Sequence, residues 1–206
     1  MPQTIIPVAA VRGTAAGVLF MAFFGTLWAG IGIRGLQGWG FIWFLMVSLL
    51  IGVFLLIGGI KLIKKSKLLS NVIMEGNSAR HSKRMGIMFG IIFGLEGVFI
   101  AAASAICRAA NHLDLFVPIM ALIVGAHFFP LARLFRVRIH YIAGTLLCLL
   151  AIVTLLTLPV RIIIEHHQIE VWWATLGFGS ALILWGTGAA LWVSGIGLLK
   201  RASERY

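Results

Sequence analysis

Charged residues are scarce in this chain, and acidic residues are the scarcest. Asp, Glu, Lys and Arg make up 11% of the 206 residues, and only 6 residues are acidic. Hydrophobic residues make up 61%, which is more apolar surface than a water-soluble domain can bury. The composition therefore excludes an ordinary soluble protein and indicates a chain surrounded by lipid.

Cysteine frameworks and enzyme motifs are also missing. The two cysteines, Cys107 and Cys148, lie in separate apolar runs, which favours small packing residues over a disulfide framework. The sequence has no GxSxG, no HExxH and no glycine-rich phosphate loop, so an intramembrane enzyme is the least favoured class and no cofactor is expected.

No positive charge precedes Arg12, and the apolar run after it is too long for a signal peptide, so we expect an uncleaved first span.

Six long apolar runs are present instead. In lipid the backbone must satisfy its own hydrogen bonds, so spanning segments are helices or closed barrels. Continuous apolar runs, rather than alternating ones, indicate helices. We therefore predict an all-α integral membrane protein with a single six-span domain over residues 1–206. The expected spans are residues 13–33, 40–60, 85–107, 115–134, 139–160 and 171–199, with a basic loop at 61–84.

Basic residues gather on one side of these spans. Of the 17 Lys and Arg residues, only Arg34, Arg108 and Arg161 fall on the other side. Cytoplasmic loops of membrane proteins are rich in Lys and Arg, so we predict a multi-pass protein of the cell membrane with both termini in the cytoplasm. The net charge of +11 would attract anionic lipids at that face. No basic and aromatic groove pattern predicts binding of nucleic acid.

The six runs can be paired as three two-helix hairpins of similar length. The second, fourth and sixth runs end alike, in GGIKLIKKS, FFPLARLFR and GIGLLKRAS. These endings are consistent with a threefold repeat of one hairpin unit. Topology alone also requires apolar runs that end in basic residues.

One acid, Glu96, lies near the middle of the third expected span. An acid at the centre of a spanning helix costs about 2.5–3.5 kcal/mol on insertion scales. Removal from water disfavours a charged carboxylate, so we expect an uncharged acid unless a cation lies beside it. One interpretation is a neutral acid that fixes packing through a hydrogen bond. We favour a site that handles protons or cations, because ionisable groups inside membranes are mostly functional.

The same span carries a stripe of glycines, Gly86, Gly90 and Gly94. This small-xxx-small pattern lets a second helix approach closely. At about 100° per residue, Glu96 lies about 200° around the helix from Gly94. We therefore predict a tightly packed face and, nearly opposite, a face that carries the acid. The glycine face and the small size of the chain suggest a homo-oligomer.

A second polar landmark, His127, lies inside the fourth expected span, three residues before Pro130. Proline cannot donate a hydrogen bond to the carbonyl of Ala126, and its ring kinks the helix. Kinked helices with free carbonyls form ion sites in many transporters. We hold this interpretation equal to that of a buried packing histidine. Helix depth permits Glu96 and His127 to meet directly or through a water molecule or an ion.

Two short motifs resemble a family of small six-span bacterial membrane proteins of unassigned function. They are FGLE at Glu96 and GAHFFPLA at His127, which follow the patterns FGxE and GxHFxPLA. The resemblance covers the third and fourth spans best. It implies that Glu96, His127 and Pro130 belong to a shared motif, and it implies no activity.

Metal-ligand side chains are densest in the loop after the fifth span, at His166, His167 and Glu170. If this loop is helical, His166 and Glu170 share a face, and with His112 and Asp114 they could hold Zn²⁺ or another divalent ion. No metal-binding spacing supports such a site, so a solvated loop is favoured.

These features predict a small transporter or channel-like protein. Glu96 would be the carboxylate that responds to protons or cations, and His127 would be its partner. The alternative is a non-catalytic membrane module for assembly or lipid binding, in which the same pair only fixes packing.

Overall fold

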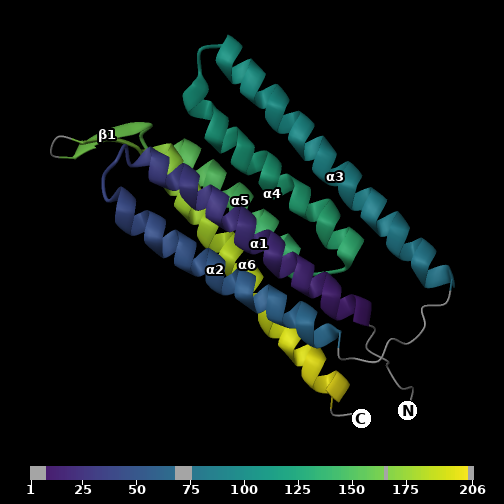
Figure 1. Ribbon diagram of the computed structural model, residues 1–206. Helices are drawn as coiled ribbons and strands as arrows, with labels where there is room; N and C mark the ends of the chain where they lie inside the picture. The colour runs from purple at the N-terminus through teal and green to yellow at the C-terminus, as the bar shows by residue number, and fades with distance from the viewer. Residues whose placement is uncertain (1–7, 68–75, 165–166, 204–206) are drawn as a thin grey trace.

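Six long helices make up most of the computed structural model (Figure 1). The structure describes residues 8–67, 76–164 and 167–203. Each helix contains a segment long and apolar enough to cross a membrane. The prediction of an all-α, multi-pass membrane protein is therefore confirmed. The helices are α1 (Val8–Gly35), α2 (Phe41–Ser66), α3 (Gly76–Ala109), α4 (Phe116–Phe135), α5 (Ile139–Thr157) and α6 (Val171–Ser203).

The helices differ from the expected spans mainly at the basic end of the bundle. Helix α2 continues to Ser66 and α3 begins at Gly76, so both ends of the predicted 61–84 loop are helical. Helix α5 is shorter than expected and ends at Thr157, and Leu158 after it is extended (φ −103°, ψ 143°). The cause is the following proline, which disfavours helical geometry in the residue before it.

The bundle is held by unequal contacts between neighbouring helices. Helix α1 packs most extensively on α6 and also on α2, while α4 packs on α5. Helix α3 lies at one edge beside α4, and α2 lies at the opposite edge (Figure 1). The members of each predicted hairpin, α1 with α2, α3 with α4 and α5 with α6, are neighbours.

Glycines make the closest helix crossings. A Cβ atom added to Gly177 of α6 would overlap the backbone of Gly32 in α1. Between α4 and α5, a Cβ atom added to Gly144 would lie 2.7 Å from the carbonyl oxygen of Gly125. At both crossings the two backbones touch, which is how membrane helices gain packing energy without a hydrophobic driving force.

The predicted glycine stripe of α3 is not at a helix crossing. Cβ atoms added to Gly86, Gly90 and Gly94 would meet no atom within 4 Å in the described chain. Only 6% of the most apolar window of α3 is buried, against 22–44% for the other five helices. The expected tight packing at this stripe is therefore wrong within one chain, because α3 turns its Glu96 face toward α4 and its glycine face outward.

The Gly32–Gly177 crossing predicts a specific loss of stability in Gly177→Ala. The added methyl group would meet backbone, which cannot move aside, so we expect a loss of about 1–3 kcal/mol. Unfolding in mixed micelles of increasing SDS content measures this change. The matched control is Gly186→Ala on the same helix, where nothing lies within 4 Å and the better helix propensity of alanine should be neutral or stabilising. Equal stability of the two variants would contradict the crossing.

Candidate functional site

Glu96 and His127 lie side by side where α3 meets α4. Atom Oε1 of Glu96 is 3.4 Å from Nδ1 of His127, and each side chain is only 9% exposed. The glutamate points inward because it lies on the face of α3 that contacts α4. The structure thus brings together the two ionisable residues that the sequence singles out in these spans.

The imidazole of His127 is oriented by its own helix. Its Nδ1 atom lies 2.6 Å from the carbonyl oxygen of Val124. A carbonyl only accepts hydrogen bonds, so Nδ1 carries the proton in this arrangement. The contact with Glu96 is longer than an ordinary hydrogen bond, so the carboxylate is held less tightly than the ring. In the neutral ring, Nε2 then carries the free lone pair.

Two buried polar atoms of the pair have no partner among the described residues. They are Oε2 of Glu96 and Nε2 of His127. An unsatisfied buried polar atom costs about 1–3 kcal/mol. In native proteins such atoms usually mark a bound water, an ion or a functional role. The pair is therefore chemically incomplete on the side away from the Glu96–His127 contact.

A cavity of about 170 Å³ lies beside the pair. It is formed mainly by α1, α3 and α4, and Glu96 and His127 are its only ionisable lining residues. The other lining residues are aliphatic, methionine or aromatic. The five aromatic lining residues are Phe20, Phe24, Trp28, Phe93 and Phe128. The site therefore combines one acid and one base with an apolar, aromatic wall.

The cavity is asymmetric along the bundle. On the side of the basic helix ends, the ring of Phe20 packs edge-on against Phe89 and Phe93, with ring centroids 5.8 and 5.6 Å apart. Toward the other end, the lining includes Leu27, which is 50% exposed on the side of α1. The cavity therefore lies beside the lipid-facing surface of α1.

Pro130 is not part of this cavity. Pro130 and Ala126 both lie on the exposed face of α4, and neither lines the cavity. The carbonyl beside the imidazole is that of Val124, so the prediction that Pro130 frees a carbonyl for the site is wrong. The cause is helical geometry, because Ala126 is rotated by about 100° from His127.

A second buried histidine, His140, lies close to the pair, and no sequence pattern singles it out. It is 6% exposed in the first turn of α5. The ring of Phe128 lies 4.6 Å from that of His127 and 5.8 Å from that of His140, so it contacts both imidazoles. In the sequence His140 follows Arg138 closely, which is typical of a basic loop. Its burial results from the packing of α5 on α4.

The predicted metal ligands near the end of the bundle away from the basic helix ends are not assembled into a metal site. Residues 161–170 contain an antiparallel β-hairpin, β1 (Arg161–Ile164) and β2 (His167–Glu170). Residues 167–170 form a strand and not a helix, so the helical face that would join His166 and Glu170 is not formed. His166 lies outside the described residues. Among the described residues, no three His, Cys, Asp or Glu side chains form a group that could hold a metal ion.

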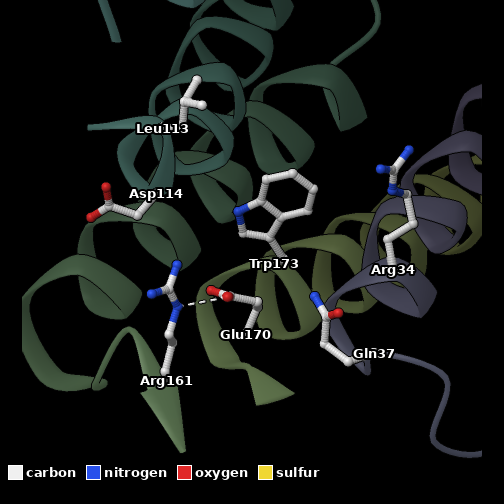
Figure 2. A pocket seen from close by; sticks show the side chains of 7 residues that line it. All are labelled: Arg34, Gln37, Leu113, Asp114, Arg161, Glu170 and Trp173. Carbon is white, nitrogen blue, oxygen red and sulfur yellow. Dashed lines mark hydrogen bonds and ion pairs between the residues drawn. The ribbon is translucent and has the colours of Figure 1, made fainter. Parts of the chain in front are cut away.

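A second cavity, of about 230 Å³, lies beside this hairpin (Figure 2). Arg161 and Glu170 are cross-strand partners, and Nε of the arginine donates to Oε1 of the glutamate at 2.6 Å. The carboxylate of Glu170 is thus engaged by arginine. Asp114 and Arg34 line the same cavity on either side of Trp173 (Figure 2), whereas His112 is exposed and does not line it.

No family model, curated protein or solved structure matches this chain. The resemblance of the FGLE and GAHFFPLA motifs to a bacterial family stays a prediction.

The Glu96–His127 contact predicts coupled stabilities. In a double-mutant cycle with Glu96→Ala and His127→Ala, we expect a coupling free energy of about 0.6–1.7 kcal/mol, as for polar pairs between other membrane helices. Unfolding in SDS mixed micelles provides each value. The control cycle pairs Glu96→Ala with His140→Ala, which are not in contact, and should give a coupling below about 0.5 kcal/mol. Couplings of the same size in both cycles would contradict the direct contact.

Proposed function

We propose that this protein is a small membrane transporter or channel-like protein in which Glu96 and His127 respond to a proton or another cation. The single observation that supports this proposal is the incomplete polar pair, whose unpartnered oxygen and nitrogen lie buried beside a cavity. A purely structural pair would be expected to satisfy its own polar atoms.

The chemistry of the pair suits exchange between a proton and a cation. In an apolar cavity the negative charge of the Glu96 carboxylate is unfavourable. The side chain therefore either binds a proton or lies close to a positive charge. A cation that enters therefore favours release of the proton, and return of the proton favours release of the cation. His127 supplies a second position for a proton at Nε2, because its Nδ1–H is directed at the carbonyl of Val124.

Flux measurements in liposomes test this function. We expect the wild type to move protons across the bilayer when a gradient of Na⁺, K⁺ or a small organic cation is imposed. In Glu96→Gln we expect the rate of proton flux to be at least tenfold lower. A pH-sensitive dye trapped in the liposomes reports the movement. The control variant is Glu170→Gln, which removes a carboxylate of the distant hairpin and should retain flux. Absence of flux in the wild type for every cation would overturn the proposal.

The outward glycine stripe of α3 favours the alternative function, an assembly module. Gly86, Gly90 and Gly94 meet no atom of the described chain, so a helix of a second copy could approach α3 there. In that case the Glu96–His127 pair serves only packing. Glu96→Gln would then retain the fold and partner binding, because a neutral amide can replace a neutral acid, and there would be no transport to lose. The flux experiment therefore separates the two functions.

The charge asymmetry adds a proposed orientation. We propose that the helix ends at Arg12, Ser66 and Lys200 face the cytoplasm, where Lys and Arg are enriched and where they would meet anionic lipids. The protein would then lie in the cell membrane with the β-hairpin outside.

Thiol labelling in intact cells checks this orientation. In a Cys107→Ala, Cys148→Ala background, we expect a membrane-impermeant maleimide to label Gln168→Cys directly. Lys67→Cys should be labelled only after the cells are broken. Both positions are exposed in the folded chain, so burial does not confound the comparison. The reverse pattern of labelling would contradict the proposed orientation.

A further inference from the structure

We propose that the cavity beside Glu96 takes a small organic ammonium cation. This inference rests on the proposed function, because it names the class of cargo at the same site. It is supported by the lining of the cavity and by its size.

The lining does not suit an inorganic cation. Hard ions such as Mg²⁺ and Ca²⁺ take six or more oxygen ligands, and K⁺ is bound by rings of carbonyl oxygens. Among the described side chains that line this cavity, only the carboxylate of Glu96 and the imidazole of His127 can act as strong ligands for a cation. Catalytic Zn²⁺ needs three protein ligands, and here there are two. An inorganic ion would therefore lose its hydration shell without replacement.

An organic ammonium ion needs what the cavity provides. Its charge is spread over alkyl groups that contact aromatic faces favourably, and one carboxylate is enough to balance it. The rings of Phe20 and Phe24 meet that of Phe93 at 75° and 71°. All three rings line the cavity, and Trp28 adds the most favourable ring type for cation–π contact.

The volume limits the size of the cation. At about 170 Å³, the cavity is slightly larger than an engineered cavity of about 150 Å³ that binds benzene. A tetramethylammonium ion should fit, whereas tetraphenylphosphonium, with four phenyl groups, should not.

Protons should compete with this cation. The titratable groups that face Glu96 are His127 on α4 and, behind the ring of Phe128, His140 on α5. The lining residues from α1 and α6 carry no ionisable group. Binding of one ammonium ion therefore replaces one proton on the carboxylate of Glu96, and that proton passes to the solvent. Affinity should fall as the pH is lowered.

Calorimetric titration of the purified full chain in nanodiscs tests the inference. We expect tetramethylammonium to bind with release of a proton, and neither tetraphenylphosphonium nor the uncharged tert-butanol to bind comparably. Glu96→Gln should weaken binding at least tenfold. Phe24→Leu should weaken it about two- to thirtyfold. The control Phe99→Leu alters an exposed ring on α3 outside the cavity and should bind like the wild type.

The outcomes separate this inference from the proposed function. If tetramethylammonium does not bind while liposomes still show Glu96-dependent flux of protons with Na⁺ or K⁺, the cargo class is wrong and the transporter survives. If tetramethylammonium binds through Glu96 but no cation produces flux, the site is right and the transporter is wrong. Equal binding in Glu96→Gln, or equal binding of tert-butanol, would overturn the cation site itself.

Discussion

The contact between Glu96 and His127 is the constraint around which the rest of the bundle can be understood. Hydrocarbon offers no hydrogen bonds, so polar atoms at this depth must be met from within the protein. Here the acid of α3 is met by the imidazole of α4, which is itself held by the carbonyl of Val124. One carboxylate oxygen and one ring nitrogen remain without a partner among the described residues, and both residues line the adjoining cavity.

The two sides of the bundle are built by different means. Around α1 and α6, glycines bring backbones into contact, and side chains such as Trp185 fill the core. Around α3, contact depends on aromatic side chains, such as Phe93 against Phe20 and Phe24, and on the polar pair. At the crossing of Gly32 and Gly177 the touching backbones leave no room for a ligand. The arrangement around α3 leaves the cavity, because aromatic rings in edge-to-face contact do not close every gap.

Much of this arrangement follows from sequence, and the exceptions have physical causes. Run lengths locate all six helices, and the rarity of ionisable residues in apolar runs points to Glu96 and His127. The glycine pattern does not reveal which glycines lie at crossings, because Gly32 and Gly177 meet only through the fold. The β-branched residues Ile162–Ile164 are typical of a strand. The charged residues beside them are typical of a solvated loop, so the sequence does not predict the hairpin.

The peripheral position of α3 has a consequence for motion. Lipid tails are as apolar as the side chains that α3 presents to its neighbours, so tilting this helix outward exchanges protein contacts for lipid contacts at little cost in free energy. Outward tilting is opposed by the aromatic contacts of Phe93 with Phe20 and Phe24 and by the contact between Glu96 and His127. A change in the charge of that pair would therefore change how firmly α3 is held against α4.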